Sequence, residues 1–157
     1  MLYVTTSRKP SVATRKLARA IATLAGGECE NRGKRSVQEA VERAQARGFK
    51  RLALVYENHG NPSEVLFLEK ENWLGRIVIN SVVFPSEKPA SRVPQGAVPG
   101  GVADGEKGRA ILELFGVKER KAAVSIHASQ NELSFTVNGE PWGPLVKLGG
   151  VEVGAVD

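Results

Sequence analysis

The chain has 157 residues but only one cysteine and two histidines, which limits the chemistry that it can support. A single cysteine cannot form an internal disulfide framework, and one cysteine with two distant histidines is too small a set for a structural zinc site. His59 and His127 lack partners at the spacing of a metal site or a catalytic triad. We therefore expect both histidines to be structural, and we expect no metal, no cofactor and no catalytic residue.

Long apolar runs are also absent. No stretch approaches the roughly 20 apolar residues that cross a bilayer, and the first residues read as a strand rather than as the apolar core of a secretory signal. The sequence contains no Walker loop, no G-x-G-x-x-G fingerprint and no paired-carboxylate signature. These absences predict a cytoplasmic protein with neither a membrane partner nor a small-molecule substrate.

The charge that is present is unevenly distributed along a chain of net charge +5. Residues 1–51 contain twelve Lys and Arg against four Glu, a balance of +8. Residues 52–157 contain ten Lys and Arg against thirteen acidic residues, a balance of −3. Such an asymmetry gives one part of the surface a strong positive potential, which favours an anionic partner, although ordinary solvated helix faces are the alternative explanation.

The most informative segment is a strand, a turn and a basic helix at the N-terminus. Residues Leu2 to Thr5 read as a strand, and the turn from Thr6 to Ser11 leads into a helix over Val12 to Ala25, with Ser11 as its N-cap. A second basic segment, Asn31 to Arg35, follows soon after. Hydroxyl groups, backbone N–H groups and fixed positive charge around a helix N-terminus suit phosphate, either in a nucleic acid or in a small phosphoester.

The remaining pattern predicts an α/β fold. A capping-box pattern starts a second helix at Ser36, and residues 85–105 hold four Pro and four Gly, which indicates a long loop between two halves, 1–84 and 106–157. A short helix is expected over Glu106 to Phe115, and Asn138-Gly139 is a hairpin signal. Residues Val151 to Asp157 are expected to fray. Strands are predicted at Arg51–Glu57, Glu64–Glu71, Arg76–Phe84, Ala122–Ala128, Glu132–Val137 and Leu145–Leu148.

One motif argues for an enzyme. Cys29 to Ser36 fits the C-x5-R-S spacing of the phosphate loop of cysteine-dependent phosphatases, in which a thiolate attacks phosphorus and an arginine, here Arg35, clamps the phosphoryl oxygens. Glu28 and Glu30 flank the cysteine, however, and would raise the pKa of the thiol and repel a phosphate dianion. The motif also lacks a general acid, so we keep the phosphatase as the minor alternative and expect Cys29 to be a half-buried strand residue.

The order of several short blocks resembles the Brix-domain family of ribosome-biogenesis factors. The blocks are Thr6-Ser7-Arg8-Lys9-Pro10-Ser11, Asn31-Arg32-Gly33, His59-Gly60-Asn61-Pro62, Gly108-Arg109 with Leu114-Phe115-Gly116, and Trp142-Gly143-Pro144-Leu145. They span essentially the whole chain as one Brix domain, 1–157. The match is closest to the branch that serves early small-subunit rRNA processing, and the compact form resembles an archaeal member.

The resemblance implies a fold of two similar α/β halves, like the anticodon-binding domain of some aminoacyl-tRNA synthetases, with mixed sheets and few short helices. It also implies a non-enzymatic, RNA-binding factor of pre-rRNA processing and small-subunit assembly. Its partners would be rRNA or a guide RNA together with pre-ribosomal proteins. It would be cytoplasmic, or nucleolar in a eukaryote.

We hypothesise that the two basic segments form one phosphate-binding surface at one edge of the sheet, where ligands of α/β folds usually bind. Some of these side chains could instead pair with Glu28, Glu39 or Glu42, and a protein-only assembly scaffold is a further alternative. The predicted RNA-binding residues are Ser7, Arg8, Lys9, Ser11, Arg15, Lys16, Arg19, Arg32, Lys34 and Arg35.

Overall fold

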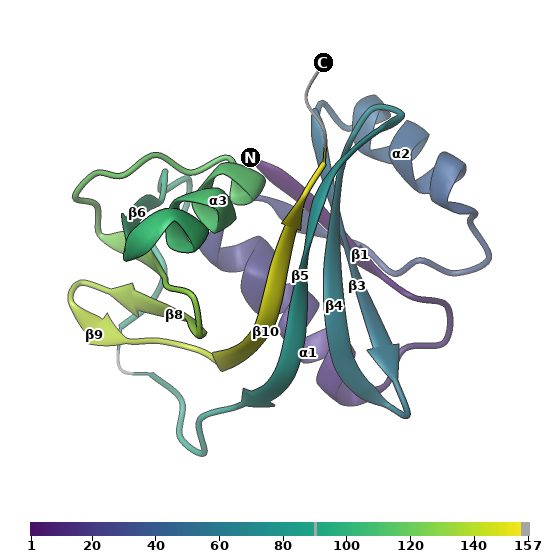
Figure 1. Cartoon of the computed structure of the whole chain (residues 1–157). Helices are drawn as coiled ribbons and strands as arrows, with labels where there is room; N and C mark the ends of the chain where they lie inside the picture. The colour runs from purple at the N-terminus through teal and green to yellow at the C-terminus, as the bar shows by residue number, and fades with distance from the viewer. Residues whose placement is uncertain (90, 155–157) are drawn as a thin grey trace.

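The computed structural model describes residues 1–89 and 91–154, and these residues form three helices and ten strands (Figure 1). The helices are α1 (Val12–Leu24), α2 (Val37–Ala46) and α3 (Gly105–Phe115). The strands are β1 (Leu2–Thr6), β2 (Glu28–Cys29), β3 (Arg51–Asn58), β4 (Asn61–Glu69), β5 (Asn72–Val83), β6 (Gly100–Ala103), β7 (Val124–Ala128), β8 (Glu132–Val137), β9 (Glu140–Pro141) and β10 (Leu145–Val153).

The strands form one mixed sheet in the order β2-β1-β3-β4-β5-β10-β8-β7-β6, with β9 paired to β8. In the first half β1 and β3 are parallel, and β3, β4 and β5 are successively antiparallel. In the second half β6 and β7 are parallel, and β7, β8 and β10 are successively antiparallel. Apart from β2 and α2 in the first half and β9 in the second, each half has a β-α-β-β-β arrangement, and the halves join where β5 pairs antiparallel with β10. The predicted fold class of two similar α/β halves is therefore confirmed.

The helices lie on both faces of this sheet. Helices α1 and α3 pack on one face, where Leu17 and Ile111 contribute to the main core and the rings of Phe67 and Phe115 meet edge to face at 5.1 Å. Helix α2 packs on the opposite face of the first half, in a smaller core that includes Tyr3 (Figure 1). None of the helices in residues 1–89 and 91–154 is long and apolar enough to span a membrane.

The expectation of a loop over 85–105 is wrong at its end, because β6 (Gly100–Ala103) lies there and begins the second half. The Pro/Gly composition hid this strand. Its glycines are needed for packing, since a Cβ on Gly100 would lie 2.2 Å from the Arg120 carbonyl oxygen. The described part of the remaining segment is held against the protein, because the Trp142 indole N–H donates to the Ser91 carbonyl at 3.2 Å.

A short strand that was not predicted, β9, follows the Asn138-Gly139 turn, and the other differences lie at strand ends. Strand β10 extends to Val153, so the expectation that the chain frays from Val151 is wrong for residues 151–153, and residues 155–157 lie outside the described part. The strand continues because it stays paired with β5 through register shifts at Leu148, which accommodate Gly149-Gly150. The predicted hairpin is confirmed, since Asn138 and Gly139 have φ values of 53° and 82°.

Candidate nucleic-acid interface

The first basic segment is a tight turn between β1 and α1. Pro10 disfavours helical geometry at the residue before it, and Lys9 has a φ of 51°, in the left-handed region that non-glycine residues rarely adopt. The turn leaves Arg8 and Lys9 exposed. Helix α1 then begins after Ser11, whose hydroxyl oxygen accepts a hydrogen bond from the Thr14 N–H at 3.2 Å and so confirms the predicted N-cap.

The N-terminus of α1 is occupied by a carboxylate of the protein itself. Glu57 Oε2, from the end of β3, accepts hydrogen bonds from the Thr14 hydroxyl at 2.6 Å and from the Ser11 N–H at 3.0 Å. These bonds hold the pKa of Glu57 below its ordinary value. The Ser11 hydroxyl donates to the Gly60 carbonyl at 2.7 Å. The donors that the sequence assigned to phosphate at Ser11 are thus engaged by Glu57 and Gly60.

The second basic segment is tied to the end of β1 by Arg32. This side chain is only 6% exposed. Its Nε donates to the Arg35 carbonyl at 2.8 Å and its Nη1 donates to the Thr6 carbonyl at 3.2 Å. Within residues 1–89 and 91–154, no carboxylate forms an ion pair with Arg32. Arg32 therefore positions the loop and brings an uncompensated positive charge into it.

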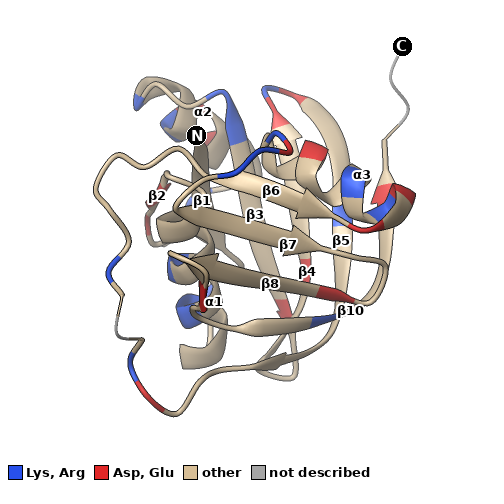
Figure 2. Ribbon diagram, turned by 90° about the vertical axis from the view of Figure 1, so that its left-hand side faces the viewer, with Lys and Arg blue, Asp and Glu red and all other residues tan. Residues whose placement is uncertain are grey.

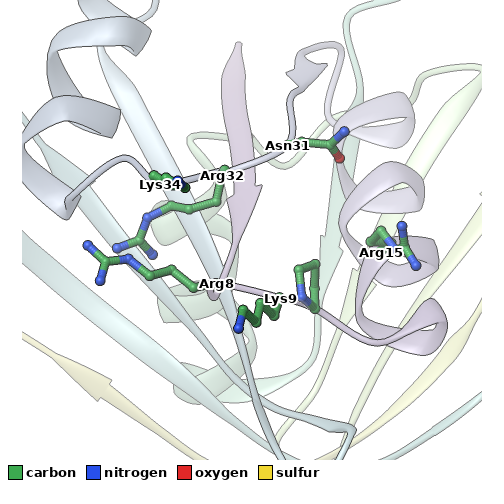
Figure 3. Close-up of a pocket in the computed structure, with 8 residues that line it drawn as sticks. Arg8, Lys9, Arg15, Asn31, Arg32 and Lys34 are labelled. Atoms are coloured by element: carbon green, nitrogen blue, oxygen red, sulfur yellow. The ribbon is translucent and has the colours of Figure 1, made fainter.

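The two segments meet in one pocket of about 550 Å³. Figure 3 shows Arg8 and Arg32 extending together on the side away from α1, with Arg15 and Asn31 on the side of α1. Among residues 1–89 and 91–154, no acidic side chain lines this pocket. Sequence reasoning could not establish that the two segments are adjacent, because their contact depends on the parallel pairing of β1 with β2 and β3. The lining residues are Arg8, Lys9, Pro10, Arg15, Asn31, Arg32, Gly33 and Lys34.

The acidic residues nearest in sequence to the second segment are neutralised elsewhere. Arg47 on α2 pairs with Glu28 at 2.6 Å and with Glu30 at 3.1 Å, and Arg43 pairs with Glu30 at 3.4 Å. None of the eight basic residues predicted for the interface forms an ion pair within the described residues. The alternative that they pair with Glu28, Glu39 or Glu42 is therefore not what the structure shows, and their positive charge stays available to an external anion.

Five of the ten predicted residues line the pocket, and the other five are not among its lining residues. The Lys16 ammonium lies 5.5 Å from the centroid of the Phe84 ring and so leaves the pocket. Arg35 Nη1 donates to the Asn31 carbonyl at 3.2 Å. Arg19 lies one turn along α1 from Arg15. The Ser7 hydroxyl is buried and has no hydrogen-bond partner within the described residues.

Sequence reasoning missed three lining residues, Pro10, Asn31 and Gly33. Each is part of a short block that the family resemblance singled out, but none of the three was among the predicted RNA-binding residues. Gly33 has a φ of 59° and a Cβ there would meet nothing within 4 Å, so its backbone conformation rather than crowding favours glycine. Their position inside the two basic sequence blocks is the signal that could have identified these three residues as part of the site.

Cys29 does not have the surroundings of a nucleophile. Burial raises the pKa of its thiol; the positive charge of Arg19 opposes this rise in part, and the Glu30 carboxylate adds a still smaller increase. The thiol lies on β2, as expected for a strand residue, and does not line the pocket. Within residues 1–89 and 91–154, no group of three His, Cys, Asp or Glu side chains is placed to hold a metal ion.

Sequence comparison finds archaeal relatives, although no family model matches the chain. A probable Brix domain-containing ribosomal biogenesis protein of Methanothermobacter thermautotrophicus is 34% identical over 88 residues, which are 56% of this chain and 54% of that protein. The protein of the same description from Methanosarcina mazei is 28% identical over 136 residues, 87% of this chain and 84% of its own. A third, from Methanosarcina barkeri, is 39% identical over 69 residues, 44% of this chain and 42% of its own. The chain thus spans about half the length of two of these relatives and most of the other.

Structural comparison supports the same relationship at the level of the fold. The crystal structure of a probable ribosomal biogenesis protein from Aeropyrum pernix superimposes with a TM-score of 0.80 at 24% identity and covers 95% of both chains. The crystal structure of Mil, an archaeal Imp4-like protein, gives a TM-score of 0.79 at 24% identity and covers 98% of this chain and 100% of that one.

Proposed function

Because the chain is a relative of the Brix-domain ribosomal biogenesis proteins, as its sequence motifs indicated, we propose that it binds RNA during ribosome assembly. The RNA would be pre-rRNA or a guide RNA, and the role would be in pre-rRNA processing and small-subunit assembly. The protein would act in the cytoplasm beside pre-ribosomal proteins. It would be a binding factor and not an enzyme, since its one cysteine is poorly placed for catalysis.

The single observation that carries this proposal is the composition of the pocket. Five cationic side chains from two separate segments, Arg8, Lys9, Arg15, Arg32 and Lys34, line one hollow without an acidic neighbour in its lining. Like charges are brought together at a cost in Coulomb energy. A polyanion recovers this cost, and each neutralised phosphate also releases condensed counterions.

The distribution of charge supports the same surface. In Figure 2 blue Lys and Arg segments lie on α1 and near α2, and also on α3 and on the loop beside β6, whereas strands β6, β7 and most of β8 are tan. Strands β6 and β7 contain no charged residue at all. The second half repeats the β-α-β-β-β arrangement but begins α3 with Gly105-Glu106, so it lacks the equivalent basic turn. We therefore place RNA binding in the first half.

The test is the salt dependence of binding to structured rRNA fragments, measured by fluorescence anisotropy at a series of KCl concentrations. Five phosphate contacts to single-stranded or looped RNA predict that log affinity falls with log salt at a slope of about −3.5. Binding without salt dependence, or no binding to any fragment, would reject an electrostatic RNA interface and favour the protein-only scaffold.

A further inference from the structure

The shape of the pocket says more than its charge. An RNA duplex presents its phosphates on a convex surface and is recognised mostly by contacts along its shallow groove and backbone. The cations here instead surround a hollow of about 550 Å³, a size typical of sites that enclose a small ligand. A recess of this kind suits an RNA group that is displaced from the stacked helix and inserts into the pocket.

One side of the pocket suits a phosphate. The Arg32 guanidinium has five N–H donors, of which Nε and Nη1 are directed to backbone carbonyls. No carboxylate pairs with it in the described part of the chain, although the side chain is only 6% exposed. A buried charge without a counter-charge is costly. Figure 3 shows Arg8 extending beside Arg32, so an anion between the two guanidinium groups would relieve both the burial and the repulsion.

The other side suits a base. Arg15 and Asn31 lie on the side of α1 (Figure 3), and Pro10 lies between Lys9 and the N-cap Ser11 in the same lining. The planar Arg15 guanidinium can stack on a base, and the apolar Pro10 ring can pack against a base by van der Waals contact. The Asn31 side chain carries both a hydrogen-bond donor and an acceptor, which match the edge of an unpaired base. A ligand that carries both a phosphate and a base would explain why the uncharged residues Pro10 and Asn31 line a pocket that is otherwise basic.

We propose that the pocket takes one unpaired RNA nucleotide, with its phosphate between Arg8 and Arg32 and its base between Arg15, Pro10 and Asn31. This inference rests on the proposed RNA binding and adds the class of RNA structure that the site selects. A bulged nucleotide in a helix would bind, and a continuous duplex would not enter. We expect the bulged nucleotide to be preferred about tenfold over a continuous stem, which corresponds to about 1.4 kcal/mol.

The experiment compares three RNA hairpins that differ at one position: a continuous stem, the same stem with one bulged nucleotide, and the same bulge with an abasic residue. Affinities are measured for the full chain at fixed salt. We expect the bulged stem to bind about tenfold more tightly than the other two. Asn31→Ala and Arg15→Gln should reduce this ratio toward one, while Arg109→Gln, an exposed arginine on α3 outside the pocket and outside the predicted RNA-binding set, should leave it unchanged.

Each outcome is decisive. Equal affinity for all three RNAs with a steep salt dependence rejects the nucleotide pocket and leaves the proposed RNA binding intact. Tight binding of the abasic bulge shows that the site takes phosphate alone, which also rejects base insertion. Absence of salt-sensitive binding to any RNA rejects both proposals. Because Asn31 and Arg15 are exposed side chains, loss of folding in their variants is not expected, and circular dichroism checks this.

Discussion

The carboxylate of Glu57 accepts a hydrogen bond of 2.6 Å from the hydroxyl of Thr14, which lies 43 positions earlier in the chain. Through this bond the end of β3 fixes the start of α1. The helix N-terminus that seemed suited to phosphate therefore already holds an anion. The positive charge left for a ligand comes from side chains in the turn before the helix and in the loop after β2.

Replacing Glu57 with Gln should lower the free energy of unfolding by about 1–2 kcal/mol, because charged capping bonds to Thr14 and Ser11 are lost. The measurement is urea unfolding at pH 7. Glu71→Gln, an exposed carboxylate in the β4–β5 turn, is the matched control and should change stability by less than about 0.5 kcal/mol. Equal effects of the two variants would show that Glu57 does not stabilise the helix start.

The same pair predicts a pH dependence. Bonds from Thr14 and Ser11 lower the pKa of Glu57 in the folded protein, below its value in the unfolded chain. The stabilisation from Glu57 is therefore complete above the unfolded pKa, and it is lost as the pH falls through the folded pKa. The difference between the wild type and Glu57→Gln should be constant near neutral pH and should shrink in acid. A difference that grows in acid would contradict this assignment.

Arg32 should be mainly a determinant of stability. Arg32→Gln removes the bonds to the Thr6 and Arg35 carbonyls, and we expect a loss of about 2 kcal/mol. Lys34→Gln, two positions away and exposed, should cost less than about 0.5 kcal/mol. Thermal unfolding of both variants gives the comparison, and a neutral effect of Arg32→Gln would show that the buried guanidinium is dispensable for the fold.

Gly108 is predicted to be intolerant of a side chain. Alanine is the better helix former by about 1 kcal/mol, yet a Cβ on Gly108 would lie 2.4 Å from the Ala128 carbonyl oxygen and would push α3 away from β7. Gly108→Ala should therefore destabilise the protein despite its helix propensity. Gly33→Ala, where a Cβ has open space, should show only the strain of its positive φ, about 1 kcal/mol. A stabilised Gly108→Ala variant would contradict the packing of α3.

The thiol of Cys29 should react slowly. Burial raises its pKa, so little thiolate is present at pH 7. Alkylation by iodoacetamide should be slower in the folded protein than in the urea-unfolded protein, with the difference followed by mass spectrometry. Cys29→Ser should leave RNA affinity unchanged. Rapid alkylation at neutral pH, or hydrolysis of an aryl phosphate that vanishes in Cys29→Ser, would instead support the phosphatase alternative.

Local signals predicted much of the fold. The capping box at Ser36 forms between its side chain and Glu39, as the pattern indicated, and Asn138-Gly139 forms its hairpin turn. Strand β6 was missed because its glycines, which allow close packing against Arg120 and Leu112, look like loop residues in the sequence. Glycines that allow two distant segments to pack closely produce no alternating hydrophobic pattern in the sequence, so such a strand is not recognised.

The sequence predicted which basic residues belong to the candidate site, but it did not predict the contacts that these segments make with the rest of the protein. The basic turn and the Asn31–Arg35 loop were identified from composition and from the family resemblance. Glu57, which accepts hydrogen bonds at the N-terminus of α1, is 43 positions from its partner Thr14. Phe84, whose ring lies beside the Lys16 ammonium, is 68 positions from Lys16. Such pairings are set by the order of strands in the sheet, which sequence patterning does not specify.

The most direct test of the account compares two triple variants with the same loss of charge. Arg8, Arg15 and Lys34 line the pocket and are exposed, whereas Arg92, Arg109 and Lys121 are exposed and lie outside it. Each set is changed to Gln, and the affinity for a structured rRNA fragment is measured against salt. We expect the pocket triple to lose at least about tenfold in affinity and to reduce the salt slope by about 2, with a much smaller effect of the control triple. Equal losses in the two variants would contradict a localised RNA-binding pocket.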